Sequence, residues 1–422
     1  MMSINDSQIA IIGLGYVGLP LAIEFSKKYK VFGFDIDFNR INELKCGVEK
    51  TKEVHIQDLY HLNNIHFTND PKEISNCNIF IITVPTPIDK FKVPDLRPIL
   101  EATKTIGTII KKNDVIIYES TVYPGCTEED CVPILEKVSG LKFNEDFFCG
   151  YSPERINPGD KVNTLVNIKK VTSGSNPEIA NFVDELYSSI IFAGTYKAQS
   201  IRVAEASKAI ENAQRDINIS FINELALIFE KMGIDTNDVL DAAATKWNFL
   251  KYKPGLVGGH CIGVDPYYLA HKSESLGYYP QVILSGRRVN DNMGIFVANK
   301  MIKLLIENNV SIKGAKVLIL GITFKENCPD IRNSKVIDVY NELIQFGVNV
   351  DVFDPHADKL QVFNEYKIDL IKNIKCNYRG IILAVAHDEF LQIDFQKHKE
   401  DNNCIIYDLK SFIDRNIATH RL

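Results

Sequence analysis

Short apolar runs alternate with amphipathic stretches in the first part of the chain, and this pattern predicts strands and helices in turn. The run at 8–12 predicts a strand, the pattern at 19–29 a helix, and the run at 31–34 a second strand. Two further apolar runs, at 79–84 and 115–118, predict strands with helices between them. Such alternation is typical of a parallel sheet covered by helices on both faces.

The pattern changes near residue 198, where a long stretch without proline or glycine begins. Residues 198–232 predict one helix, and Gly233 is a natural stop. Its apolar positions recur at spacings typical of one helix face. They are Val203, Ile210, Ile217, Phe221, Leu225 and Ile228. We expect this helix to link two domains and to offer a face for dimerisation.

A second alternation of strands and a helix follows Gly314. The apolar run at 317–320 predicts its first strand, and 334–346 predicts a helix. Further strands are predicted at 348–353, 380–385 and 405–409. The fold class is therefore α/β, with a strand-and-helix domain at each end of a helical middle.

Composition narrows the class of protein. The 422 residues are 45% hydrophobic and 24% charged, with a net charge of −6. The acidic balance argues against nucleic acid as a partner, and no apolar run approaches the length of a membrane span. We expect no secretory leader. Nine cysteines without a CxxC pair are typical of a reducing compartment, so we expect a cytoplasmic protein with free thiols.

A dinucleotide-binding fingerprint follows the first predicted strand. Residues 13–18 read Gly13-Leu14-Gly15-Tyr16-Val17-Gly18, and Asp35 ends the next strand. In this context glycines let the backbone approach a pyrophosphate at a helix N-terminus. Asp35 would bind a ribose diol and repel a 2′-phosphate, which favours NAD over NADP. Arg40 complicates this preference, because a nearby arginine could accept that phosphate.

The stretch 255–265 places Cys261 among four glycines, with Asp265 at its end. Glycines permit close approach of the backbone to a ligand, so a thiol presented in this way suits a nucleophile. His260 adjoins Cys261, but adjacent side chains usually point apart, and we do not assign it as the base. No cluster of His, Cys or Asp has convincing metal-ligand spacing, so no metal is predicted.

Other candidates remain open on the residues alone. Lys208 and Asn212 share a helix face and could stabilise an oxyanion, or could form a solvated face. Glu154, in a proline-marked loop, could be a general base or a surface acid. The segment 119–121 follows a predicted strand and could bind a ligand or form a turn. Segments 323–325 and 330–334 could bind a phosphate or nucleotide, or form a charged loop with a helix cap.

Taken together, these motifs resemble the UDP-glucose/GDP-mannose dehydrogenase family of nucleotide-sugar 6-dehydrogenases, over nearly the whole chain. The motifs are those at 13–20, 83–87, 119–125, 152–154, 258–261 and 324–327, with Lys208 and Asn212 between them. Within the family, the segments at 259–268 and 285–291 resemble the branch acting on UDP-N-acetylglucosamine or UDP-N-acetylgalactosamine. Those enzymes supply uronic acids for capsule and O-antigen synthesis.

The resemblance implies a fold of two Rossmann-like doubly wound domains joined by a helical middle domain with one long helix. We expect an NAD-binding domain at 1–197, a central dimerisation domain at 198–305 and a UDP-sugar-binding domain at 306–422. It also implies a UDP-sugar substrate and a homodimer or higher homo-oligomer.

The resemblance further implies a four-electron oxidation of the sugar C6 hydroxyl with two NAD⁺, through a thiohemiacetal and a thioester on Cys261. Lys208 and Asn212 would stabilise oxyanions, Glu154 would act as acid or base, and Asp265 and Thr121 would position water. The expected cofactor contacts are Gly13, Gly15, Tyr16, Val17, Gly18, Asp35, Arg40, Thr86 and Thr121. The expected substrate contacts are Glu154, Arg155, Lys208, Asn212, Gly258, Phe324, Lys325 and Arg332.

The chain departs from the family pattern at two places. Members acting on UDP-glucose often carry a second glutamate four residues after the one that matches Glu154, and here Pro158 stands there. The arginine often found upstream of the nucleophile is missing, and Lys246 and Trp247 occupy that region. Both departures are compatible with a bulkier 2-acetamido sugar.

Several alternatives stay open. UDP-N-acetylmannosamine or UDP-glucose could be the substrate. A two-electron 3-hydroxyacid dehydrogenase would share the glycine-rich turn and the Lys/Asn helix, but would need neither Cys261 nor a third domain. A nucleotide-binding protein without catalysis would have no use for the candidate catalytic residues.

Overall fold

The computed structural model describes residue 4 and the ranges 7–49, 64–156, 163–259, 262–400 and 403–422. Cys261, His260 and Pro158 lie outside the described residues. The chain forms two compact units. The first comprises Met1–Glu211 with Tyr267–Tyr278, and the second comprises Asn212–Pro266 with Tyr279–Leu422.

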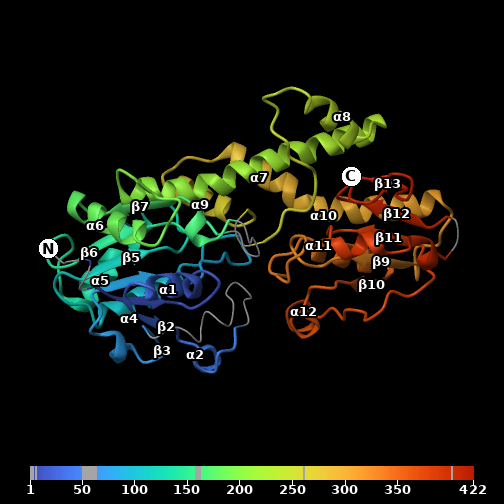
Figure 1. Cartoon of the computed structure of the whole chain (residues 1–422). Helices are drawn as coiled ribbons and strands as arrows, with labels where there is room; N and C mark the ends of the chain where they lie inside the picture. Colours follow the sequence, from blue (N-terminus) through green and yellow to red (C-terminus); the bar gives the residue numbers. More distant parts are fainter. Residues whose placement is uncertain (1–3, 5–6, 50–63, 157–162, 260–261, 401–402) are drawn as a thin grey trace. The chain divides into compact units, whose positions relative to one another are not determined.

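The first unit is built on an eight-stranded sheet in the order β3-β2-β1-β4-β5-β6-β7-β8 (Figure 1). All neighbouring strands are parallel except β6 and β7. The first six strands follow the order of a dinucleotide-binding fold. The strands are β1 Gln8–Ile12, β2 Lys30–Phe34, β3 Ile65–Thr68, β4 Ile79–Ile82, β5 Val115–Tyr118, β6 Phe148–Tyr151, β7 Lys170–Gly174 and β8 Thr195–Lys197.

Helices follow the strands of this sheet in turn. They are α1 Gly18–Ser26, α2 Phe38–Lys45, α4 Arg97–Gly107, α5 Val132–Ser139 and α6 Pro177–Ser188, with short turns η2 Pro71–Ile74, η3 Thr127–Cys131 and η4 Leu165–Asn167. One core cluster joins Ile9 and Ile11 of β1 to Leu21 and Phe25 of α1. These alternate β1 side chains bury one face of the sheet.

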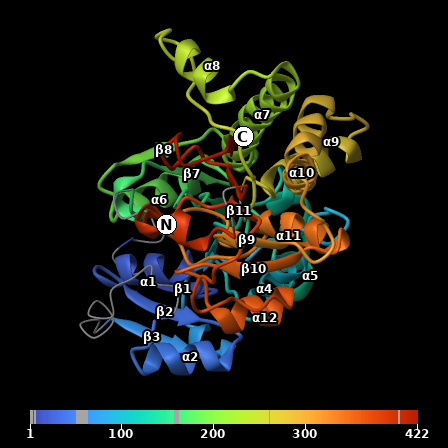
Figure 2. The ribbon, with the colours of Figure 1, turned by 90° about the vertical axis from the view of Figure 1, so that its right-hand side faces the viewer.

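The second unit carries a five-stranded parallel sheet in the order β10-β9-β11-β12-β13, of which Figure 2 labels β9, β10 and β11. Val317 and Ile319 of β9 enter one core cluster, and Leu318 and Leu320 enter another. Both faces of the sheet are therefore covered, as in a doubly wound fold. The strands are β9 Lys316–Leu320, β10 Asn349–Phe353, β11 Gly380–Leu383, β12 Ile405–Asp408 and β13 His420–Arg421.

Two of the remaining helices, α7 Ile201–Met232 and α10 Gln281–Glu307, are long. The other remaining helices are α8 Thr236–Ala243, α9 Asp265–Ser275, α11 Val336–Gln345 and α12 Lys359–Tyr366, with turns η5 Asp388–Gln392 and η6 Phe395–His398. α7 begins three residues later than the predicted helix at 198–232 and ends where predicted. Gly233 then adopts a φ of 70°, a left-handed conformation suited to glycine.

The predicted α/β fold class, with Rossmann-like ends and a helical middle, is confirmed. The boundaries expected for three domains stay a prediction. Within the part of the chain that the structure describes, no helix is long and apolar enough to span a membrane.

Candidate active site

The glycine-rich turn lies at the carboxyl end of β1, beside β4, where the strand order reverses. A Cβ on Gly18 would lie 1.9 Å from the Gly13 carbonyl oxygen and 2.4 Å from Thr83 Oγ1, so this close turn requires glycine. A Cβ on Gly15 would meet nothing within 4 Å. The exposed backbone at Gly15 is therefore open to a ligand, which is the geometry that a pyrophosphate needs.

Asp35 is oriented by its own backbone surroundings. Its Oδ2 accepts the Leu14 N–H at 2.8 Å, and its Oδ1 accepts the Asp37 N–H at 2.9 Å. Arg40 donates from Nε to the Leu14 carbonyl at 3.0 Å and pairs with Glu49 at 3.1 Å. Because Glu49 neutralises this guanidinium, the arginine is less suited to a 2′-phosphate than its position in the sequence suggested.

The other expected cofactor residues are near this turn or at the adjacent strand ends. Tyr16 and Val17 lie within the turn and are partly buried, and the Val17 carbonyl accepts the Leu21 N–H at 3.3 Å. Thr86 follows β4 and Thr121 follows β5, and both are partly buried. They lie beyond the carboxyl ends of parallel strands, where α/β sheets bind ligands.

Glu154 follows β6 and belongs to a buried ionic cluster in the first unit. Its Oε1 accepts the N–H groups of Arg155 and Ile156, each at 2.5 Å. Its Oε2 lies 3.2 Å from Lys170 Nζ, which also lies 2.7 Å from Glu119 Oε2. Burial, opposed by Lys170, raises the pKa of Glu119 to about 7. The cluster therefore holds a carboxylate, an ammonium ion and an acid that titrates near neutral pH.

Arg155 turns its side chain to other protein groups. Its guanidinium pairs with Glu211 at 2.7 Å and donates to the Lys169 carbonyl at 2.8 Å. Its backbone N–H, by contrast, binds Glu154. The contacts of Arg155 thus fix the loop that carries Glu154.

Lys208 and Asn212 lie one turn apart on α7, and both are buried, with exposed fractions of 7% and 5%. No hydrogen bond or ion pair joins the Lys208 ammonium to another described residue. Asn212 Nδ2 donates to Asp265 Oδ2 at 2.5 Å, and Asp265 is 2% exposed in the first turn of α9. Two of the expected catalytic residues, Asn212 and Asp265, are thus in direct contact, and Asp265 is the first residue of α9.

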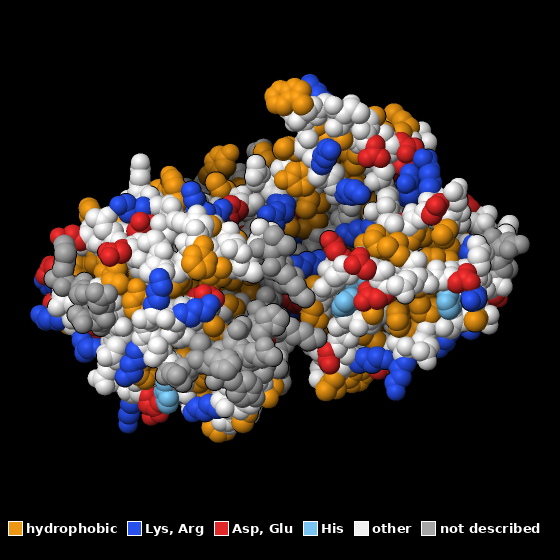
Figure 3. All heavy atoms as spheres, in the orientation of Figure 1, with side chains coloured by type: hydrophobic (Ala, Val, Ile, Leu, Met, Phe, Trp, Pro, Cys, Tyr) orange, Lys and Arg blue, Asp and Glu red, His pale blue; other side chains and the backbone are white. Residues whose placement is uncertain are grey.

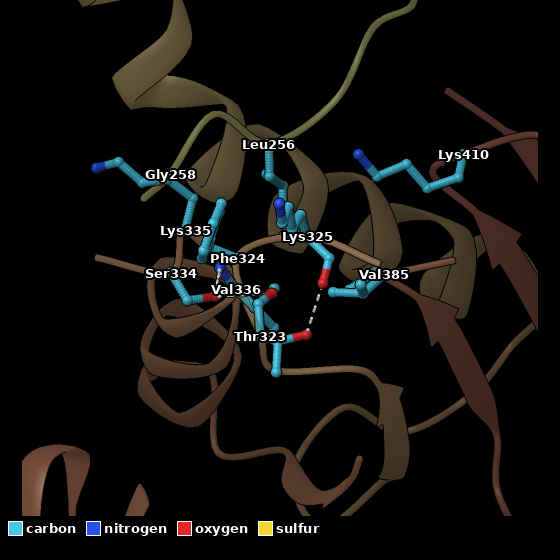
Figure 4. Close-up of a pocket in the computed structure, with 11 residues that line it drawn as sticks. Leu256, Gly258, Thr323, Phe324, Lys325, Ser334, Lys335, Val336, Val385 and Lys410 are labelled. Carbon is cyan, nitrogen blue, oxygen red and sulfur yellow. Dashed lines mark hydrogen bonds between the residues drawn. The ribbon is translucent and has the colours of Figure 1, made fainter. Parts of the chain in front are cut away.

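A pocket lies in the second, C-terminal unit, beyond the carboxyl ends of β9, β11 and β12 (Figure 4). β9 and β11 are the neighbours at which the order of this sheet reverses. An open parallel sheet binds its ligand at such a point. The pocket is lined by Leu256, Gly258, Thr323, Phe324, Lys325, Ser334, Lys335, Val336, Ala384, Val385 and Lys410.

Three of the expected substrate residues, Gly258, Phe324 and Lys325, line this pocket. Arg332 lies outside the lining and pairs with Asp330 at 2.6 Å. A Cβ on Gly258 would lie 2.5 Å from the Asn333 carbonyl, so this glycine lets the 255–259 loop pack against the neighbouring segment.

Sequence reasoning missed three groups at these sites. Lys335 and Lys410 line the pocket, and Lys170 joins Glu154 to Glu119, which belongs to the candidate segment 119–121. Lys410 comes two residues after the end of β12, a position that could have been flagged once the strand was predicted. Lys170, as the first residue of β7, carried no such signal.

Three family domains match this chain in order. Residues 7–191 match the NAD binding domain of the UDP-glucose/GDP-mannose dehydrogenase family, residues 202–292 its central domain, and residues 318–415 its UDP binding domain. The match confirms the resemblance inferred from the motifs and the expectation of NAD as cofactor.

Relatives and solved structures agree with this match. A UDP-N-acetyl-D-glucosamine 6-dehydrogenase of Pseudomonas aeruginosa is 55% identical over 99% of this chain and 100% of its own length. One of Salmonella typhi is 55% identical over 97% of each chain. The structure of a UDP-D-ManNAc dehydrogenase from Pyrococcus horikoshii superposes with a TM-score of 0.88 at 28% identity, covering 98% of each chain. The chain therefore belongs to the UDP-glucose/GDP-mannose dehydrogenase family of NAD-dependent oxidoreductases.

Proposed function

We propose that this enzyme oxidises the C6 hydroxyl of a UDP-N-acetylhexosamine, with UDP-N-acetylglucosamine as the first candidate, to the uronic acid. The observation that carries this choice is the 55% identity, over 99% of the chain, to a UDP-N-acetyl-D-glucosamine 6-dehydrogenase. UDP-N-acetylgalactosamine differs only in configuration at C4 and is the comparison substrate. The product would supply polysaccharide synthesis such as that of a capsule or O-antigen.

The glycine-rich turn and Asp35 fit NAD. The open backbone at Gly15 and the close turn at Gly18 suit a pyrophosphate, and Asp35 suits the ribose diol. When bound, NAD⁺ accepts the hydride that leaves C6. Tyr16, Val17, Arg40, Thr86 and Thr121 would border the cofactor.

The protein supplies a nucleophile and a set of polar groups. The C6 alcohol first loses a hydride and a proton to give an aldehyde. The Cys261 thiolate adds to the aldehyde carbon and forms a thiohemiacetal, and loss of a second hydride gives a thioester. Water then cleaves the carbon–sulfur bond, which releases the carboxylate and the thiolate. Each sugar thus gives up four electrons to two NAD⁺.

The polar residues have separate roles in this scheme. Lys208 and Asn212 stabilise the oxyanions, since an ammonium and an amide N–H are donors suited to developing negative charge. Asp265 holds the Asn212 amide through the 2.5 Å hydrogen bond and, with Thr121, positions water. Glu154 acts as the acid/base group of thioester hydrolysis, and Arg155 holds its loop.

The pocket of the C-terminal unit is the proposed UDP site. Lys325 and Lys410 bring two lysine side chains to its lining, which suits a diphosphate, whereas the Lys335 ammonium pairs with Asp291 at 3.2 Å and Asp338 at 3.0 Å. Phe324 offers an aromatic face and Gly258 close backbone approach. Arg332, which lies outside the lining, would contact the substrate at the edge of this pocket.

The chain would work as the three domains 1–197, 198–305 and 306–422, and as a dimer built on α7. The predicted apolar stripe of this helix is largely at the surface, with Val203 47%, Ile210 55%, Phe221 57% and Ile228 46% exposed. Figure 3 shows apolar side chains at the surface where Figure 1 draws α7. A second copy of the chain would cover such a stripe. None of the eight described cysteines forms a disulfide, which supports a cytoplasmic enzyme.

Substitution of the nucleophile tests the proposal. Cys261→Ala should abolish uronate formation from UDP-N-acetylglucosamine, measured by chromatography of the products, while NAD binding persists. Cys376→Ala, which removes an exposed free thiol, is the matched control and should leave the rate unchanged. Uronate formation at the control rate by Cys261→Ala would exclude the thioester route and favour a two-electron dehydrogenase.

A further inference from the structure

The first unit buries a lysine that has no place in the proposed catalytic set. Lys170 begins β7, and its side chain is 3% exposed. Its ammonium lies 2.7 Å from Glu119 Oε2 and 3.2 Å from Glu154 Oε2, so it bridges two carboxyl groups. Burial alone would lower the pKa of Lys170, but the two carboxyl groups outweigh burial and raise it. Lys170 is therefore a buried cation held by its neighbours.

Glu119 lies behind this lysine and is closed off from solvent. Its side chain is 0% exposed, and its Oε1 accepts a hydrogen bond from the Tyr187 hydroxyl of α6. Burial, the charge of Glu154 and the opposing charge of Lys170 together bring the pKa of Glu119 to about 7. Its charge therefore changes near neutral pH.

Glu154 is the outermost member of the cluster, with a side chain 10% exposed. Two backbone N–H groups hold its Oε1, which leaves Oε2 to Lys170. We propose that Lys170 is a positioning residue that orients Glu154 and supplies its counter-charge, and that the charge on Glu119 sets how strongly it does so. This inference rests on the acid/base role proposed for Glu154.

Other charged groups on the surrounding elements already have partners. Asp184 of α6 accepts the Thr172 hydroxyl at 2.6 Å, and Arg155 pairs with Glu211 of α7 at 2.7 Å. Within the described residues, Lys170 is the one cation in hydrogen-bonding contact with Glu154. The charge balance at Glu154 thus depends mainly on Lys170 and Glu119.

The signs of the expected shifts follow from this balance. Without the ammonium, two buried carboxyl groups face each other, so the protonated form of each is favoured. A general base must be deprotonated, so loss of the ammonium should move the acid limb of kcat against pH to higher pH. Loss of the Glu119 charge leaves the ammonium to Glu154 alone, so it should move the acid limb to lower pH.

The test uses the full-length enzyme with NAD⁺ and UDP-N-acetylglucosamine. Lys170→Met should move the acid limb of the profile of kcat against pH to higher pH by at least about one pH unit, and Glu119→Gln should move it to lower pH. Both should leave KM close to the wild-type value. At the low-pH end, acid-quenched Lys170→Met should carry more sugar-acyl thioester by intact mass spectrometry. Lys169→Met, which removes the exposed neighbouring lysine, is the matched control with a wild-type profile.

A folded Lys170→Met enzyme with the wild-type pH profile would overturn the inference. If that variant does not fold, Glu119→Gln is compared with the double variant Glu119→Gln/Lys170→Met, which removes the buried ion pair together. The acid limb of the double variant should lie at higher pH than that of Glu119→Gln. Acid limbs at the same pH in the two variants would overturn the inference. Wild-type enzyme that yields no NADH with any UDP-sugar would instead refute the proposed function itself.

Discussion

At the scale of single residues, the acids of this enzyme are held by groups from the backbone or from distant strands. Asp35 and Glu154 each accept backbone N–H groups, and Asp265 accepts the amide of Asn212. Such contacts fix the direction of a carboxylate before a ligand binds, so little reorganisation is needed during the reaction.

Asn212 is the residue whose contribution to rate is most direct to measure. We expect Asn212→Ala to lower kcat by ~10²–10³, because one oxyanion donor is lost. Asn218→Ala, on the same helix and with its amide bonded to the Gln214 carbonyl, is the control and should be near wild type. Steady-state kinetics give kcat of each variant, and a melting curve shows whether the variant is folded. A loss below about threefold in kcat would remove Asn212 from the oxyanion site.

The residues of the site could be predicted only where the sequence places them in a motif. Lys208, Asn212 and Asp265 were found in this way, and the structure adds the contact between the last two. Glu119 and Lys170 are 51 residues apart in the chain and meet only because β5, β6 and β7 are neighbours in the sheet. No local pattern predicts such a pair, since buried lysines are rare and a lysine in a sequence is normally expected at the surface.

At the scale of elements, the turn between β1 and α1 combines two glycines with different tasks. Gly18 permits the close turn itself, whereas Gly15 leaves the backbone open. The two tasks are separable, because a methyl group collides with the protein at one position and with nothing at the other.

We therefore expect Gly15→Ala and Gly18→Ala to fail in different ways. Gly15→Ala should melt like the wild type but weaken NAD⁺ binding at least about tenfold, since its methyl would lie where the pyrophosphate approaches. Gly18→Ala should lower the melting temperature, because its Cβ would lie 1.9 Å from a backbone oxygen. Calorimetric titration with NAD⁺ and thermal unfolding separate the two. Unchanged NAD⁺ affinity in Gly15→Ala would contradict this reading of the turn.

The start of α7 supplies a buried acid that should make stability depend on pH. Glu205 accepts the N–H groups of Gly125 and Thr127 at 2.5 and 2.9 Å, and burial raises its pKa from 4.5 to about 7. Between these values the folded state binds more protons than the unfolded state. The contribution of Glu205 to the free energy of unfolding therefore falls as pH rises from 4.5 to about 7.

The matching experiment is urea unfolding of wild type and Glu205→Gln across that pH range. The wild type should lose stability relative to the variant as pH rises. Glu224→Gln, an exposed position on the same helix, should run parallel to the wild type. A difference between wild type and Glu205→Gln that does not change with pH would show that Glu205 has the same pKa folded and unfolded.

Helices and strands could be predicted from the sequence where their buried positions form a regular pattern of apolar residues. The strand at 115–118 matches β5 at both ends, because it is a continuous apolar run buried on both sides. The helix predicted at 19–29 ends earlier, at Ser26, because Tyr29 packs into the core from a turn. α10 was not predicted, since two of its buried positions, Arg287 and Asn290, are polar. Arg287 and Asn290 both bind Asp216 of α7, which no periodic pattern of apolar residues reveals.

At the scale of the whole molecule, the exposed apolar stripe of α7 accounts for the proposed dimer. Phe221→Glu should convert a dimer to monomers, because a charge would then have to be buried at the interface. Phe192→Glu, at an apolar residue 86% exposed elsewhere, is the control and should keep the dimer. Light scattering after gel filtration gives the masses. A dimer that survives Phe221→Glu would place the subunit contact on another surface.

The central claim, a four-electron oxidation of a UDP-N-acetylhexosamine, is tested most directly by the yield of NADH from limiting sugar. UDP-N-acetylglucosamine, UDP-N-acetylgalactosamine, UDP-N-acetylmannosamine and UDP-glucose would each be consumed completely with excess NAD⁺. We predict two NADH per molecule of UDP-N-acetylglucosamine and the highest rate with that sugar or its C4 epimer. One NADH per sugar would contradict the thioester route, and no NADH with any of the four would contradict the substrate class.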